Sequence, residues 1–183
     1  MNNEMTKKEI ASYGVAGLGQ NIVYLFSSTF LAIYYTDVFK ISPVIVGVLV
    51  LTARVWDACN DFIMGVIVDN TRTKWGKLRP YLLIAPIPIA ILTVLTFTAP
   101  DLTSSLKIVY IFVTYILWGM AYTLGDVPYW GLQAAMSHDS KERTKLITFT
   151  RLMTMIGTAI VLLEFLYFLI YLVKEKFMML KAI

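Results

Sequence analysis

The stretch that decides the fold of this chain is PVIVGVLVLTARVWDACNDFIMGVIV, residues 43–68. As a helix it is long enough to cross the hydrocarbon core of a bilayer, which takes about 20 predominantly apolar residues. Two carboxylates, Asp57 and Asp61, nevertheless lie near its middle, with Arg54 on the same helical face. A charge at the centre of a membrane helix costs about 2.5–3.5 kcal/mol on insertion scales. Intramembrane ionisable residues therefore indicate a functional site, most often an ion or substrate pathway.

Apolar runs of similar length recur along the 183 residues, of which 58% are hydrophobic. A soluble domain is about half apolar, with frequent polar interruptions. The pattern predicts an all-α, polytopic membrane helix bundle of about five transmembrane helices within residues 1–173, followed by an atypical tail at 174–183. The predicted spans lie at about residues 11–36, 43–68, 81–99, 107–132 and 146–173.

The charged side chains collect in the short segments between these spans. Nine Lys and Arg residues fall on one predicted side of the membrane: Lys7, Lys8, Arg72, Lys74, Lys77, Arg79, Lys141, Arg143 and Lys145. The other side carries two before the tail, Lys40 and Lys107. The positive-inside rule then predicts a multi-pass protein of the cytoplasmic (inner) membrane with a cytoplasmic N-terminus. The net charge of +4 reflects this topology, so we expect contact with membrane lipid and none with nucleic acid.

The two central carboxylates predict a cation site. Asp57 and Asp61 stand four residues apart on one helix, so they repel each other unless a cation or a proton lies between them. Oxygen ligands, excess negative charge and little water suit Na⁺ or H⁺, and Asn60 flanks this face. Asp57 and Asp61 would hold the metal if the ion is Na⁺, and we expect no cofactor beyond that ion. The alternative is a buried ion network in which Arg54 and an Arg of a neighbouring helix neutralise the pair.

The span 107–132 predicts a substrate site. Its residues Tyr122, Asp126 and Trp130 follow one another at four-residue intervals and therefore share a helical face. A carboxylate flanked by aromatic rings suits a sugar, because the rings stack on the apolar sugar face while the carboxylate accepts hydrogen bonds from hydroxyls. Tyr129 points off this face. The alternative is an aromatic belt at the membrane interface, which fits Trp130 better than it fits Asp126.

Two further spans bring polar side chains to a similar predicted depth. Gln20 and Asn21 lie near the middle of the first span, and Arg151 lies about two turns into the fifth. Scattered polar residues would not be expected to agree in depth in this way. We therefore expect Gln20, Asn21 and Arg151 to lie at the same polar level as the candidate cation and substrate residues.

Several motifs in this order and spacing resemble the glycoside–pentoside–hexuronide:cation symporter family of the major facilitator superfamily, of the melibiose-permease type. The resemblance covers residue 11 to about residue 160. It rests on Ser12-Tyr13-Gly14, Tyr34-Tyr35-Thr36-Asp37, Trp56-Asp57-Ala58-x-Asn60-Asp61, Gly65-x-x-x-Asp69-x-Thr71-Arg72-x-x-Trp75-Gly76-Lys77 and Trp118-Gly119-Met120-x-Tyr122-Thr123-x-x-Asp126-x-Pro128-x-Trp130.

The resemblance implies roles for particular residues. The two carboxylates of the span 43–68, Asp57 and Asp61, would bind the coupling cation with the help of Thr123. The sugar would be bound by Asp126, Trp130 and Arg151. The melibiose permease has a Lys-Asp pair where this chain has Gln20-Asn21, and Asn21 would hydrogen-bond sugar hydroxyls more weakly than a carboxylate does.

The resemblance also implies two bundles of six helices with the substrate between them. We therefore expect this chain to be an incomplete N-terminal bundle of a truncated transporter that lacks its C-terminal bundle and is inactive in transport alone. One alternative is a membrane-embedded metal-dependent phosphotransferase that uses Asp57, Asp61 and Asp69 around Mg²⁺. Asp57 lies too deep for a charged substrate, so we expect no enzyme. The other alternative is a truncated membrane protein with no transport role.

Overall fold

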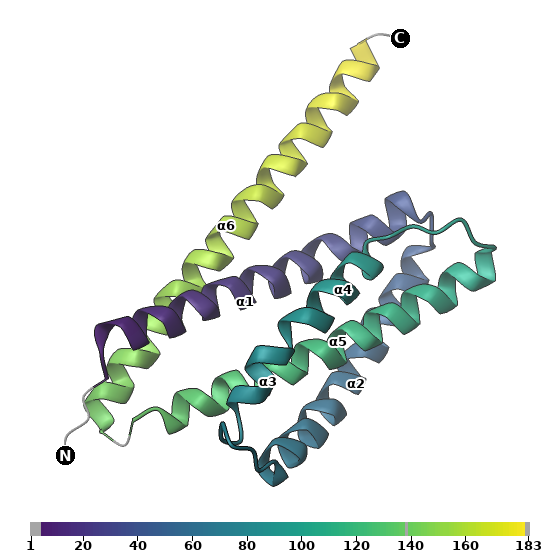
Figure 1. Ribbon diagram of the computed structural model, residues 1–183. Coiled ribbons are helices and arrows are strands. Elements are labelled where there is room, and N and C mark those ends of the chain that lie inside the picture. The colour runs from purple at the N-terminus through teal and green to yellow at the C-terminus, as the bar shows by residue number, and fades with distance from the viewer. Residues whose placement is uncertain (1–4, 138, 182–183) are drawn as a thin grey trace. The chain divides into compact units, whose positions relative to one another are not determined.

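The computed structural model describes residues 5–137 and 139–181, and within them the chain forms helices and no strand (Figure 1). This confirms the all-α class. The elements are α1 (Lys7–Ile33), the π-helix η1 (Tyr34–Val38), α2 (Pro43–Asn70), α3 (Arg79–Ile84), α4 (Pro86–Thr96), α5 (Ser104–Ala135) and α6 (Ser140–Lys181). The tail predicted from residue 174 onward continues α6 as far as Lys181, and residues 182–183 lie outside the described part.

Length and composition fit a membrane protein. Among the described residues, four helical segments are long and apolar enough to cross a bilayer: Lys7–Val38, Pro43–Asn70, Ser104–Ala135 and Ser140–Leu172. Many large apolar side chains point outward along them, including Val44 and Phe62, each 75% exposed, and Tyr167 at 74%. Water-soluble monomers rarely expose continuous apolar surface on this scale. The outward faces of these helices therefore suit a lipid environment.

The segment predicted as the third span differs from a single helix. Residues 79–96 form α3 and α4, which meet at Ala85, and α4 alone is a shorter apolar helix. Pro86 and Pro88 have no N–H to donate to the carbonyls of Leu82 and Ile84, so the helical ladder is interrupted where the two elements join. Pro86 stands in the first turn of α4, a position that tolerates proline.

Local sequence signals set the helix ends. Thr6 and Glu9 form a reciprocal capping box before α1: the Thr6 N–H donates to Glu9 Oε2 at 2.8 Å, and the Glu9 N–H donates to Thr6 Oγ1 at 3.3 Å. Asp139 caps α6 by accepting from the Lys141 N–H at 2.7 Å. At its other end α1 widens into η1, and the Phe39 N–H donates to the carbonyl of Tyr34 at 3.2 Å.

The chain divides into two compact units, residues 1–31 with 137–183 and residues 32–136. In the first unit α1 packs on α6 through glycines. A Cβ added at Gly14 would meet the Phe149 ring at 2.5 Å, and one added at Gly157 would meet the Leu18 carbonyl oxygen at 3.1 Å. Contacts therefore advance along both helices together, so α1 and α6 run in the same direction.

In the second unit α5 is the central helix, and it packs against α2, α3 and α4. Trp118 on α5 is only 3% exposed, and its Nε1 donates to Thr93 Oγ1 on α4 at 2.9 Å. Its ring stacks on Tyr115 and Tyr122, at centroid distances of 5.9 and 5.5 Å. The buried Trp118 thus fixes α4 against α5, and this packing determines which face of α5 turns toward α2.

Candidate functional site

The predicted cation-site carboxylates lie against α5 in two matched contacts. Thr123 Oγ1 donates to Asp61 Oδ1 at 3.1 Å. One turn earlier on both helices, a Cβ added to Gly119 would lie 2.8 Å from Asp57 Oδ1. Both contacts join residues 62 positions apart, so α2 and α5 run in the same direction and stay in register over a full turn. The structure therefore brings Asp57, Asp61 and Thr123 together.

Arg54 also approaches this carboxylate pair. Its Nη1 lies 3.8 Å from Asp57 Oδ2, and both side chains are partly exposed, at 47% and 33%. This distance is at the long end for an ion pair, and exposed pairs contribute only about 0–1 kcal/mol. With all three groups ionised, the cluster of Arg54, Asp57 and Asp61 carries one net negative charge. One bound monovalent cation would neutralise that charge.

Asn60 faces the interior of the second unit. Its side chain is 8% exposed, and its Nδ2 has no hydrogen-bond partner among the described residues. A buried amide donor without a partner costs about 1–3 kcal/mol. A ligand that accepted this hydrogen bond would recover that cost, whereas a cation would need the amide oxygen instead.

The predicted sugar-site residues on α5 are only partly brought together. Trp130 Nε1 donates to Asp126 Oδ1 at 3.1 Å, one turn away along the same helix. Tyr122, by contrast, stacks its ring on Trp118. Tyr129 is 4% exposed whereas Trp130 is 36% exposed, so the two neighbours face in different directions. The geometry therefore supports an Asp126–Trp130 pair. The predicted alignment of the Tyr122 ring with that pair is replaced by stacking on Trp118.

The other predicted sugar residues, Gln20, Asn21 and Arg151, belong to the first unit. Asn21 Oδ1 lies 3.1 Å from Thr158 Oγ1, which is also 3.1 Å from the carbonyl of Thr154. A hydroxyl has one proton, so it donates to only one of these oxygens at a time. When that proton goes to the Thr154 carbonyl, Asn21 can turn its NH₂ toward Thr158 and present its oxygen elsewhere. Arg151 and Thr158 share a face of α6.

Two residues in these contacts were missed as candidates from the sequence, Gly119 and Thr158. The sequence contained a clue to the contact of Gly119. Gly119 and Thr123 stand four residues apart on α5, as Asp57 and Asp61 do on α2, so the two pairs can face each other. The sequence contained no clue to the contact of Thr158, because a threonine within an apolar helix usually donates its hydroxyl to the backbone of the same helix.

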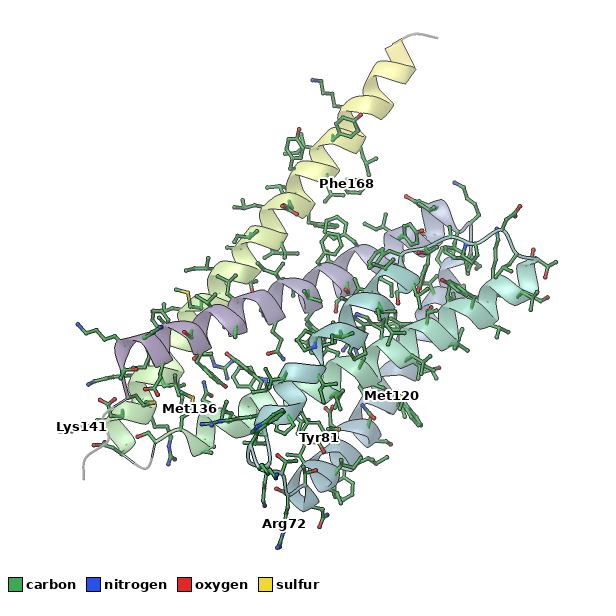
Figure 2. The ribbon with its side chains drawn as sticks, viewed as in Figure 1. Arg72, Tyr81, Met120, Met136, Lys141 and Phe168 are labelled. Carbon is green, nitrogen blue, oxygen red and sulfur yellow. The ribbon has the colours of Figure 1, made fainter. Side chains whose placement is uncertain are left out.

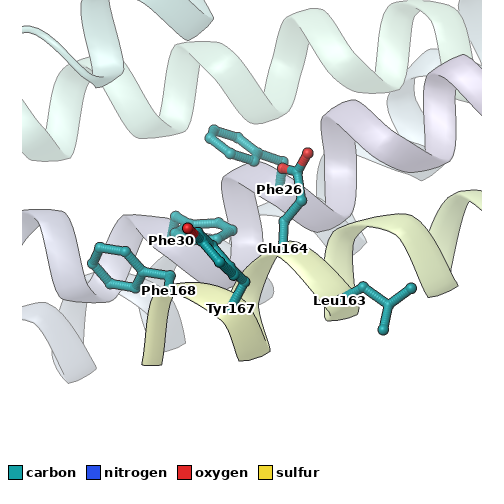
Figure 3. A pocket seen from close by; sticks show the side chains of 6 residues that line it. All are labelled: Phe26, Phe30, Leu163, Glu164, Tyr167 and Phe168. Carbon is teal, nitrogen blue, oxygen red and sulfur yellow. The ribbon is translucent and has the colours of Figure 1, made fainter. Parts of the chain in front are cut away.

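In the first unit, an open groove of about 520 Å³ lies between α1 and α6 (Figure 3). It is lined by Phe26, Phe30, Leu163, Glu164, Tyr167 and Phe168. Phe30 meets Phe165 and Phe168 edge to face, at centroid distances of 5.6 and 5.9 Å. None of the predicted site residues lines this groove, so it marks aromatic packing of the first unit.

Clusters of metal ligands are absent from the described part of the chain: no three His, Cys, Asp or Glu side chains lie close enough to hold one ion. Asp69 therefore does not complete a three-carboxylate site with Asp57 and Asp61, as the phosphotransferase alternative would require. A site at the carboxylate pair would have to draw further oxygen ligands from Thr123, Asn60 or water.

Gly119→Ala is expected to damage cation binding without destabilising the helix. The new methyl group would lie 2.8 Å from Asp57 Oδ1 and must displace that carboxylate, while alanine is the better helix former by about 1 kcal/mol. In a full-length transporter we expect the half-saturating cation concentration to rise about tenfold, as measured by cation-dependent sugar binding.

Gly65→Ala on α2 is the matched control, because nothing in the structure lies within 4 Å of a Cβ at that position. Its cation affinity should stay within about twofold of the parent. Equal effects of the two substitutions would contradict the close approach of Gly119 to Asp57.

Comparison with known proteins places the chain in a family. The family described as MFS/sugar transport protein matches residues 12–181. The chain is 43% identical over 143 residues to YagG of Escherichia coli (strain K12), a candidate glycoside/cation symporter by name; the match covers 78% of this chain and 31% of that protein.

Two further relatives agree with this. The isoprimeverose transporter of Lactiplantibacillus pentosus is 36% identical over 159 residues, covering 87% of this chain and 33% of the relative. The glucuronide carrier protein homolog of Escherichia coli (strain K12) is 34% identical over 170 residues. This match covers 87% of this chain and 37% of that protein. The chain thus spans about a third of the length of the curated relatives it matches. The relatives are named as transporters, not as enzymes. The chain belongs to the MFS/sugar transport protein family, among the glycoside–pentoside–hexuronide:cation symporters.

Proposed function

We propose that this chain supplies the N-terminal helices of a cation-coupled sugar or glycoside symporter. The observation that carries the proposal is the matched pair of contacts between α2 and α5, in which Asp57 meets Gly119 and Asp61 meets Thr123. Two carboxylates held in register against a neighbouring helix suit a coupling cation, Na⁺ or H⁺.

The proposed cation site uses Asp57 and Asp61 as charged ligands, with Thr123 and Asn60 as neutral ones. The Thr123 hydroxyl donates to Asp61, and its oxygen keeps a lone pair for a cation. If the ion is Na⁺, Asp57 and Asp61 are its metal ligands. If it is H⁺, the repulsion between the two carboxylates favours a proton shared within the pair.

In the second unit, the proposed sugar-binding residues are Asp126, Trp130 and Tyr122 of α5. Arg151, Asn21 and Gln20 are the proposed sugar-binding residues of the first unit. The 3.1 Å bond from Trp130 Nε1 to Asp126 Oδ1 orients the carboxylate beside a ring face. A sugar hydroxyl that donates to Asp126 would then lie next to the Trp130 ring. The names of the relatives, which include an isoprimeverose transporter, support a sugar substrate.

Substitutions at this site should rank by the interaction they remove. In a full-length transporter Asp126→Ala should weaken sugar binding about 10- to 100-fold, because hydrogen bonds to a charged group are worth about 1.5–3 kcal/mol. Trp130→Phe keeps a ring face and loses the bond to Asp126, so a few-fold loss is expected. Tyr129→Phe is the matched control, since Tyr129 is buried on another face. Equilibrium sugar binding measures all three, and a ranking led by Tyr129→Phe would contradict the assignment of the face.

We further propose that the protein lies in the cytoplasmic (inner) membrane with its N-terminus and the loops 69–80 and 133–145 on the cytoplasmic side. Cysteines introduced by Thr73→Cys and Ser140→Cys should resist an impermeant thiol reagent added to intact cells. Asp101→Cys, in the exposed segment between α4 and α5, should react. The native Cys59 is replaced by serine first. Ready labelling at position 73 or 140 from outside would reverse the orientation.

The last part of the proposal concerns partners. Sugar transport would need a second helix bundle that faces these helices, in addition to sugar, coupling ion and lipid. The relatives are about three times the length matched here, which supports such an arrangement. We therefore propose that residues 1–183 alone do not transport sugar.

A further inference from the structure

The segment between α2 and α3 folds into a defined turn. Thr73 Oγ1 donates to the Gly76 carbonyl at 2.6 Å and accepts from the Trp75 N–H at 3.2 Å. Gly76 adopts a φ of 92°, which side-chain-bearing residues rarely reach, and its N–H donates to the Thr73 carbonyl at 3.1 Å. Thr71 Oγ1 is hydrogen-bonded to the Tyr81 hydroxyl across the base of the turn. The backbone of this turn is therefore held by its own side chains.

The turn presents one exposed aromatic ring among cations. Trp75 is 65% exposed. The cations of the segment, all exposed, are Arg72, Lys74, Lys77 and Arg79. None of these four forms an ion pair with a carboxylate of the described residues. Figure 2 labels Arg72, the first residue of the turn, and Tyr81, which follows the turn.

The turn lies directly beside exposed apolar surface. Val66 and Ile67, at the end of α2, are 47% and 46% exposed, and Leu83 and Ile84 of α3 are 66% and 57% exposed. The helix α2 is long and apolar enough to cross a bilayer. When α2 spans the membrane, the turn that follows it falls at the level of the phospholipid headgroups. Tryptophan concentrates at this level, and clustered Lys and Arg there attract anionic lipids.

We propose that the turn Arg72–Arg79 is a binding site for the headgroup of an anionic phospholipid. The phosphate is bound by the cations, chiefly Lys74 and Lys77, while the Trp75 ring packs at the interface beside the glycerol backbone. Gly76 is a positioning residue, because its backbone conformation sets the direction in which these side chains leave the turn. The lipid-site proposal rests on the membrane placement of the turn and not on the transport function. The lipid-site proposal can therefore fail while the transport proposal holds, and the reverse is also possible.

The test uses the purified full chain in a neutral detergent and a fluorescent short-chain phosphatidylglycerol, with the matching phosphatidylcholine as reference. The chain should bind the phosphatidylglycerol probe more tightly. Near a membrane surface each cation contributes about fivefold, so Lys74→Gln/Lys77→Gln should weaken phosphatidylglycerol binding by about 25-fold. Binding of the phosphatidylcholine probe should stay within about twofold.

Two variants separate a built site from general charge. Lys7→Gln/Lys8→Gln removes the same net charge from another exposed segment and should leave binding unchanged. Gly76→Ala keeps every charge but strains the turn, and it should weaken phosphatidylglycerol binding several-fold. Circular dichroism checks that the helix content of all variants is unchanged.

Three results would overturn the proposal. A loss in Lys7→Gln/Lys8→Gln equal to that in Lys74→Gln/Lys77→Gln would mean that charge alone attracts the lipid. Unchanged binding in Gly76→Ala would mean that the shape of the turn is irrelevant. Displacement of the probe by millimolar inorganic phosphate would mean that the site takes a free anion and not a lipid.

Discussion

In a full-length transporter, Asp57→Cys/Asp61→Cys is expected to abolish cation-driven sugar accumulation while leaving measurable sugar binding. The two carboxylates are the charged groups that α5 holds in register, through Gly119 and Thr123. Removing them takes away the net negative charge that a cation needs. The proposed sugar contact between Asp126 and Trp130 lies on α5 and is not touched. Sugar uptake against a gradient and equilibrium sugar binding, each with and without the cation, measure the two effects.

Asp69→Cys is the matched control, because Asp69 is an exposed carboxylate on the same helix outside the pair. It should retain cation-driven uptake. Unchanged cation dependence in the double variant would contradict the cation site.

Arg54→Gln tests the rival interpretation of the pair as a buried ion network. Arg54 lies 3.8 Å from Asp57, so in a cation site its removal makes the cluster more negative and should tighten cation binding a few-fold. In a network that exists for stability, the same change would leave Asp57 uncompensated and lower the thermal stability instead. Cation affinity and melting temperature together therefore decide between the two.

The lengths of the apolar runs were enough to predict most of this fold. Apolar runs predicted α1, α2, α5 and α6, because bilayer thickness sets the length of a spanning helix. Pro86 and Pro88 signal a possible break of the third span near Ala85, where α3 and α4 meet. Membrane helices often tolerate proline, however, because neighbouring helices can satisfy the freed backbone groups. Whether the helix breaks therefore depends on packing that the sequence does not show.

The candidate site was predictable in its residues but not in its contacts. The four-residue spacing of Asp57 and Asp61 places both on one face of α2, yet it does not say which helix they meet. That choice is made by packing such as the bond from Trp118 to Thr93, which orients α5. Tyr122 illustrates the limit, because its spacing pairs it with Asp126 whereas its ring stacks on Trp118.

Expressed by itself, the polypeptide of residues 1–183 is expected to insert into the membrane and to transport no sugar. Four apolar helices drive insertion. The charged side chains within them, Asp57, Asp61, Asp126 and Arg151, each cost about 2.5–3.5 kcal/mol if they face lipid. We propose that a second bundle normally covers these groups and supplies the opposite wall of the sugar site. Alternating access by the rocking of two bundles requires both.

Proteoliposomes that hold only this chain provide the measurement. Carbonate extraction should leave the chain in the membrane fraction, whereas sugar uptake driven by a Na⁺ or H⁺ gradient should equal that of empty liposomes. Without a covering bundle the charged faces should also drive self-association, visible as aggregates in size-exclusion chromatography. Co-expression of the C-terminal bundle of a related symporter should reduce the aggregates and restore uptake, because it supplies both the cover and the opposite wall. Uptake by the chain alone above the empty-liposome background would refute this expectation, and would mean that copies of these helices cover one another's Asp57 and Asp61 in a working oligomer.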